Sequence, residues 1–404
     1  MAAVALVATA EVRAVGFEKL ALMDSLDMAY WCDVETKEGT LRLIEDAQRP
    51  GSNGILWRDK GGGGMMRYPS NEEPAPQDEC PVEKRRVPIA LDVYYELRLD
   101  NLDFDVFDFV FGTCAQKRLA YGIHQTFEEN HTGNSNQSGW TIAHPQFWNC
   151  AKDGVPFPAH ASLAFPEVRA HKLRFAAEHV ALKPQKIFLD VWRAGSWTLQ
   201  YEYVKPNVDR WHALHPGEPL PDATDERWIR LCSESTMGYL RDYGALCRSN
   251  GVEFVVGWGT TTQNGTTIRR ESCPGDVRDI NGMLAWQQFG FDWRQLVREG
   301  TVDGIWVMNV AYDPLRPFES TRETLAYMKA DMGSAKLYFG VNWYNMRHDG
   351  IESYATDAGV SNAEAARRLL DLAKDVGCAG IVYECVDCHC YPADVCDALK
   401  ETSK

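Results

Sequence analysis

Short apolar runs alternate along this chain with longer amphipathic ones. The short runs are rich in β-branched and aromatic residues and lack internal polar alternation, which is typical of parallel strands covered on both faces. We therefore expect eight strands, at residues 28–33, 54–58, 119–126, 186–189, 252–258, 302–309, 336–342 and 380–384.

The amphipathic runs predict the connecting helices, at residues 40–48, 106–117, 166–182, 225–249, 292–299, 320–332 and 362–376. Glycines follow several of these runs, where a left-handed residue commonly ends a helix. They are Gly251, Gly300, Gly333 and Gly377. An eightfold alternation of strands and helices predicts an α/β protein built as a single (β/α)8 barrel. Long loops at residues 60–88 and 128–161 are expected to wall its active face.

The composition fits one large globular domain. The chain has 404 residues, of which 45% are hydrophobic and 25% charged, as is usual for soluble proteins. A net charge of −15 disfavours nucleic acid and anionic membranes as partners, and no apolar run approaches the ~20 residues of a membrane span. We assign residues 21–404 to the barrel and residues 1–20 to a poorly defined N-terminal segment.

The N-terminal segment leaves the location of the protein open. Residues 2–10 are almost wholly apolar and end in Ala8, Thr9 and Ala10, as the cleavage end of a secretory signal does. No basic stretch precedes them. Export to the periplasm or outside the cell and a cytoplasmic location are therefore both compatible with the sequence.

Cysteines gather near the end of the last expected strand. Cys385, Cys388 and Cys390 surround His389 and offer soft ligands for zinc, or else free thiols or disulfides. A structural zinc site normally adds a second, separated pair of ligands, which this chain lacks. No glycine fingerprint of dinucleotide binding follows an expected strand either. We predict neither a metal nor a cofactor.

Polar side chains follow the expected strands at their carboxyl ends, where the active site of a (β/α)8 barrel lies. Residues 186–189 lead directly into Asp190, and Arg193 follows three residues later. The other candidates at strand ends and in the loops after them are His124, Glu129, Trp258, Asn309, Asp313, Asn342, Trp343 and Glu384. Carboxylates can cleave glycosidic bonds, amides can hold hydroxyl groups, and indole rings can stack on sugars. This set predicts a carbohydrate site.

Three segments resemble one known family. Residues 165–169, the strand that ends in Asp190 and Arg193, and residues 292–305 are similar to the bacterial family-10-like glycosyl hydrolases, which are (β/α)8 proteins. The resemblance spans roughly residues 20–390. It implies a carbohydrate-active barrel with Asp190 and Arg193 in the active cleft. Val191, Ala194 and Gly195 depart from the family pattern beside the aspartate.

We therefore predict a glycoside hydrolase that acts on a polysaccharide or oligosaccharide. Asp190 is the expected general acid, with a nucleophilic or stabilising role as the alternative. Barrels that cleave with retention commonly carry their nucleophile at strand seven, which ends here in Asn342, so we expect Glu384 to supply the second catalytic carboxylate, ahead of Asp313 and Glu129. The remaining candidates are expected to bind substrate.

Two other functions stay open. The first is a catalytically silent carbohydrate-binding barrel, because strand seven lacks an acid. The second is a metal-dependent hydrolase or isomerase that uses His124, Asp190 and Glu384, or the cysteine cluster.

Overall fold

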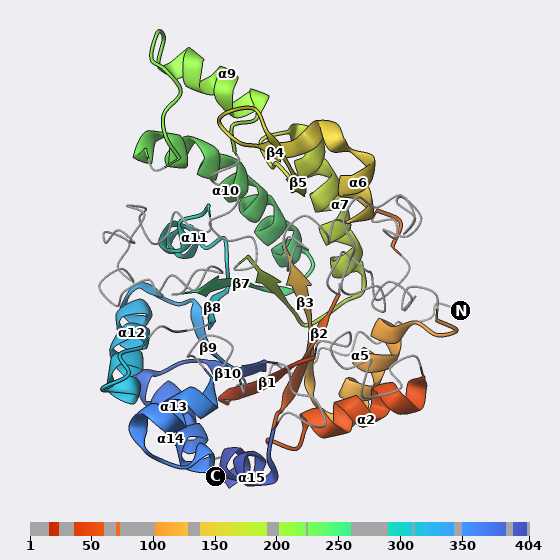
Figure 1. Cartoon of the computed structure of the whole chain (residues 1–404). Coiled ribbons are helices and arrows are strands. Elements are labelled where there is room, and N and C mark those ends of the chain that lie inside the picture. Colours follow the sequence, from red (N-terminus) through yellow and green to blue (C-terminus); the bar gives the residue numbers. More distant parts are fainter. Residues whose placement is uncertain are drawn as a thin grey trace.

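The computed structural model describes residues 16–23, 36–59, 70–72, 102–127, 138–191, 202–223, 225–259, 290–308, 310, 312–342, 350–384 and 391–401. Eight parallel strands close into a barrel in the order β1-β10-β9-β8-β7-β6-β3-β2 (Figure 1). Their bounds are β1 (Glu18–Met23), β2 (Gly54–Arg58), β3 (Ala120–Thr126), β6 (Lys186–Asp190), β7 (Glu253–Gly259), β8 (Gly304–Met308), β9 (Lys336–Asn342) and β10 (Gly380–Glu384). The expected (β/α)8 barrel is confirmed.

The first strand is not where the sequence pattern placed it. Residues 28–33 lie outside the described residues, and β1 is instead the segment that pairs with β2 and β10. The charges of Glu18 and Lys19 concealed this strand. Both side chains are nevertheless buried: Glu18 contacts Lys186 inside the barrel, and Lys19 donates to the Leu399 carbonyl at 2.6 Å. The barrel thus begins at Glu18, ahead of the expected boundary at residue 21.

Helices surround the barrel (Figure 1). Those that the sequence predicted are α2 (Lys37–Ala47), α5 (Val106–Lys117), α7 (Pro166–Ala181), α10 (Glu226–Ser249), α11 (Trp293–Arg298), α12 (Pro317–Asp331) and α14 (Asn362–Val376). Gly377 ends α14 with a φ of 79°, the left-handed conformation expected there. Two further helices, α13 (Ile351–Ala358) and α15 (Ala393–Glu401), pack beside α14. No helix within the described ranges is long and apolar enough to cross a bilayer.

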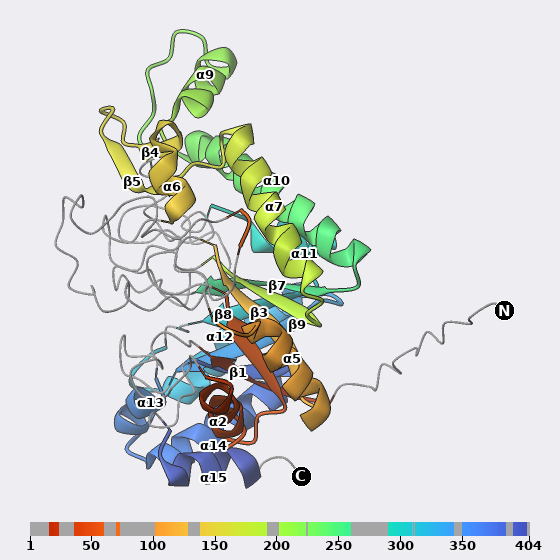
Figure 2. The same ribbon diagram turned by 90° about the vertical axis from the view of Figure 1, so that its right-hand side faces the viewer.

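A small lobe lies outside the barrel, beyond α7 and α10 (Figures 1 and 2). It comprises α6 (Gly139–Ala143), the 3-10 turn η3 (Pro145–Phe147), the antiparallel strands β4 (Trp148–Cys150) and β5 (Pro156–Ala161), and α9 (Lys205–Leu214). Tyr203, Trp211 and Trp228 form a separate apolar core between α9 and the start of α10. The sequence pattern did not reveal this lobe.

The barrel interior is filled in layers. At the amino end of the strands, Lys186 lies against Glu18, and Lys336 and Tyr338 each contact Glu253 at 2.7 Å. Above these charges, Phe188 packs edge-on against Trp306 and Tyr338, with ring centroids 5.8 and 5.1 Å away. The ionic and aromatic layers together form a solid floor under the carboxyl ends of the strands.

Candidate functional site

Asp190 and His124 form a buried acid–imidazole pair at the carboxyl end of the barrel. Asp190 is the last residue of β6, and His124 lies on the neighbouring β3. Their side chains are 0% and 1% exposed, and Nε2 of His124 lies 3.4 Å from Oδ2 of Asp190. A carboxyl group without water around it depends on such neighbours for polar contacts, so this pair is suited to hold or move a proton.

The aromatic layer supports the pair from below. The imidazole of His124 meets the Trp306 ring edge-on, with centroids 5.5 Å apart and planes at 82°. Trp306 is fully buried, and its indole Nε1 has no hydrogen-bond partner among the described residues. His124 therefore rests on a packed surface that limits the movement of its ring.

A second polar group joins β2 to β3 beside the pair. The guanidinium Nε of Arg58, the last residue of β2, donates to the hydroxyl of Thr126 at 3.3 Å. Asp59 follows Arg58 and accepts the main-chain N–H of Thr126 at 3.3 Å. All three side chains are buried. Arg58 is the last residue of the expected strand 54–58 and Asp59 follows it, but no local pattern indicated that Thr126 would contact them.

The backbone brings two expected site residues together at the ends of neighbouring strands. Asn342 ends β9, Glu384 ends β10, and the two are register partners. The Glu384 side chain lies outside the described part of the structure. Its pairing with Asp190 as a second carboxylate therefore stays a prediction.

The structure describes the contacts of two other candidates, Trp258 and Asp313. Trp258 is fully buried and packs against Trp293 of α11, with ring centroids 6.2 Å apart, so it belongs to the core between strands and helices. Asp313 lies in the loop before α12, accepts the N–H of Leu315 at 3.0 Å, and lies 3.5 Å from Arg316. Burial in this core favours a structural role for Trp258. The Asp313 side chain is 44% exposed, and its place in a sugar site stays a prediction.

The remaining expected site residues lie outside the described ranges. They are Glu129, Arg193, Asn309 and Trp343, together with the cluster of Cys385, Cys388 and Cys390. Of the described cysteines, all six are free thiols. Burial raises the pKa of Cys114, Cys247 and Cys378 to about 12, so these thiols stay protonated and are poor nucleophiles.

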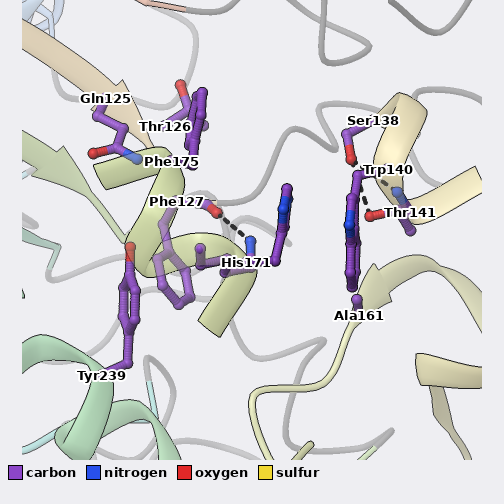
Figure 3. Close-up of a pocket in the computed structure, with 11 residues that line it drawn as sticks. Gln125, Thr126, Phe127, Ser138, Trp140, Thr141, Ala161, His171, Phe175 and Tyr239 are labelled. Atoms are coloured by element: carbon purple, nitrogen blue, oxygen red, sulfur yellow. Dashed lines mark hydrogen bonds between the residues drawn. The ribbon is translucent and has the colours of Figure 1, made fainter. Parts of the chain in front are cut away.

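A small pocket lies at the carboxyl end of β3, lined by the residues that directly follow His124 in the sequence (Figure 3). Gln125 and Thr126 of β3 line it together with Phe127, and in its wall Trp140 of α6 stacks on His171 of α7 with ring centroids 4.1 Å apart and nearly parallel planes (Figure 3). The ring of His144 also stacks on Trp140, at 4.2 Å. Because protein rings already stack on this indole, Trp140 serves as a wall rather than as a sugar platform. The sequence pointed to none of these three aromatic side chains.

Comparisons with known proteins find a shared fold but no matching family. No family model and no curated protein matches the chain. Among solved structures, the glycoside hydrolase domain of PgaB (BpsB) from Bordetella bronchiseptica matches with a TM-score of 0.53 and 12% identity, over 95% of this chain and 98% of that one. The β-galactosidase of the psychrophilic Marinomonas ef1 matches with a TM-score of 0.53 and 10% identity, over 96% of this chain and 59% of that one.

At these identities the similarity is one of fold. The chain shares its (β/α)8 architecture with glycoside hydrolases and spans less than two thirds of the β-galactosidase. The finer resemblance to the family-10-like proteins has no matching family model and stays an expectation.

Proposed function

We propose that this protein is a glycoside hydrolase that cleaves a polysaccharide or oligosaccharide, with Asp190 as a catalytic carboxylate. The observation that carries the proposal is the buried Asp190–His124 pair at the carboxyl end of β6 and β3. Active sites of (β/α)8 enzymes lie at this end of the barrel. The shared architecture with glycoside hydrolases supports the same class of reaction.

The proposed chemistry needs two carboxyl groups. Asp190 would donate a proton to the departing glycosidic oxygen, and His124 at 3.4 Å would orient the carboxyl group for that transfer. Glu384, at the end of β10, is our candidate for the second carboxylate, as base or nucleophile. A separation of about 5–5.5 Å between the two carboxyl groups would imply retention of configuration, and about 6.5–9.5 Å inversion.

The proposal is tested first by a screen. Purified protein is incubated with a panel of polysaccharides, including β-linked hexosamine and galactose polymers, and the release of reducing ends is measured. Turnover of at least one polymer is expected. Binding of a polymer without turnover would instead favour a silent carbohydrate-binding barrel, an alternative motivated by the amide of Asn342 where strand seven of many glycosidases carries an acid.

On the active substrate, Asp190→Asn should lower kcat by at least ~10²-fold, because the variant keeps the volume of the side chain but cannot transfer a proton as an acid does. Circular dichroism and thermal melting check that the fold persists. Asp331→Asn, which alters an exposed ion pair with Arg294 on the outer helices, is the control and should keep wild-type kcat. A loss smaller than about tenfold in Asp190→Asn would remove Asp190 from the catalytic machinery.

A further inference from the structure

A second buried acid–imidazole pair joins the end of β2 to helix α7. Asp59 directly follows β2, and His179 lies on the last turn of α7. Oδ2 of Asp59 and Nε2 of His179 are 3.0 Å apart, and both side chains are 0% exposed. The ring of Phe175 packs edge-on against His179 at 4.4 Å. A buried ionisable pair is weak evidence for a stabilising role. The other contacts of Asp59 indicate a further role for the pair.

Those contacts hold the backbone of β3 on both sides of Gln125. The main-chain N–H of Asp59 donates to the carbonyl of His124 at 3.0 Å, and its carboxylate accepts the N–H of Thr126 at 3.3 Å. Gln125 itself accepts from the hydroxyl of Tyr243 at 2.5 Å. Asp59 thus fixes the strand segment from which His124 reaches Asp190 and Thr126 reaches Arg58.

The same segment is tied to β6 next to the proposed catalytic group. The N–H of Phe127 donates to the main-chain carbonyl of Asp190 at 3.0 Å. A displacement of β3 would therefore move both the imidazole that contacts the Asp190 carboxyl group and the hydrogen bond at its backbone. Misplacement of a reacting group by about 1 Å can cost ~10²-fold in rate.

We propose that Asp59, oriented by His179, is a positioning residue that sets the place of His124 beside Asp190. This inference rests on the proposed glycosidase function for its kinetic consequence. Its structural consequence, the placement of the His124 ring, holds whatever the reaction is.

The barrel offers a matched control at its opposite end. Asp303, before β8, makes the same kind of clamp: its N–H donates to the carbonyl of Phe254, and its carboxylate accepts the N–H of Phe254, both at 2.8 Å. Asp59→Ala and Asp303→Ala each delete one carboxylate that accepts a strand N–H. Only the first lies beside His124.

The experiment compares three variants with the wild type by thermal melting, by kcat and KM, and by NMR of the His124 imidazole in protein with 15N-labelled histidine. The His124 signal is assigned by its loss in His124→Gln. Asp59→Ala is expected to lower kcat by about tenfold to a hundredfold with a smaller change in KM, and to shift the His124 resonances. Asp303→Ala should lower the melting temperature but leave kcat and the His124 resonances in place. His179→Gln keeps an N–H donor near Asp59 and should lie between the wild type and Asp59→Ala.

Equal losses of kcat in Asp59→Ala and Asp303→Ala, or unmoved His124 resonances in Asp59→Ala, would overturn the inference. If Asp59→Ala does not fold, His179→Leu against His179→Gln takes its place, and equal His124 spectra in the two variants overturn it. If the wild type cleaves no saccharide, the proposed function fails separately, and the His124 resonances alone decide the positioning role.

Discussion

Two tryptophans lie on opposite faces of the barrel sheet. Trp306 lies inside, edge-on to His124, whereas Trp258 lies outside, against Trp293 of α11. Successive residues of a strand point to opposite faces. A run such as Val255 to Trp258 is apolar throughout, so its sequence gives no indication of which face each residue takes. The expectation of a sugar-stacking Trp258 rested on its position at a strand end alone.

Trp258→Phe is expected to destabilise the protein by about 1–3 kcal/mol and to leave kcat and KM unchanged, because it shrinks a buried ring away from the barrel mouth. Urea unfolding and steady-state kinetics measure the two effects. Trp293→Phe is the companion variant, and since the two rings touch, the double variant should lose less stability than the sum of the single losses. A loss of saccharide affinity in Trp258→Phe at unchanged stability would restore Trp258 to the binding site.

At the scale of elements, charges join strands that are far apart in sequence. Glu18 of β1, Lys186 of β6, Glu253 of β7 and Lys336 of β9 form one ionic layer at the amino end of the barrel. Burial opposes ionisation of Glu253, but Lys186, Lys336 and the Tyr338 hydroxyl outweigh it and hold the pKa of Glu253 below its ordinary value. The carboxylate therefore stabilises the fold wherever it is ionised.

This lowered pKa gives the layer a defined pH dependence. The stabilisation by Glu253 is complete above the ordinary glutamate pKa of 4.5 and is lost as the pH falls through the lower pKa of the folded state. Glu253→Gln should cost about 1–3 kcal/mol at pH 7, and the gap to the wild type should shrink below pH 4.5. Urea unfolding from pH 3 to 7 tests this. A gap that stays constant over that range would show that Glu253 contributes by shape rather than by charge.

The elements that the sequence predicted are those with local signals. The bounds of β2, β9 and β10 and of α5 and α14 match the expected ranges, because each combines an apolar pattern with a clear start or stop. β1 was missed because its buried charges are matched only by distant partners. His179 offered no signal either, since its partner Asp59 is remote in sequence and a histidine near a helix end is ordinarily exposed.

At the scale of the whole molecule, the topology could be predicted from the sequence, but the site could be predicted only in part. Because β3 and β6 are parallel strands of one barrel, Asp190 and His124 lie at the same end of it, and the sequence pattern predicted this. Their mutual contact depends on the alternation of β3 and β6 and on their register, which no local pattern encodes. The positions of Thr126, Trp140 and His171 likewise depend on long-range packing.

Chelator treatment should leave both the melting temperature and the activity of the whole protein unchanged. We expect no structural metal, and the described residues bring no three His, Cys, Asp or Glu side chains into a metal-binding group. Thermal melting with and without EDTA, together with metal analysis of the untreated protein, tests this prediction. A marked drop in melting temperature with stoichiometric zinc would assign the Cys385–Cys390 segment as a metal site, since a structural zinc is coupled to folding.

The closure of the barrel by β1 and β10 has a consequence for synthesis on the ribosome. Glu18 pairs with Gly380 and Ala21 with Tyr383, so the outer edge of β1 has no strand partner until nearly the entire described chain has been made. Exposed strand edges invite association with other chains, and charged side chains on an edge oppose it. Glu18 and Lys19 are the charged residues of this strand. We therefore expect the charges that hid β1 from the apolar pattern to oppose association of the growing chain with its neighbours, until closure buries them against Lys186 and the carbonyl of Leu399.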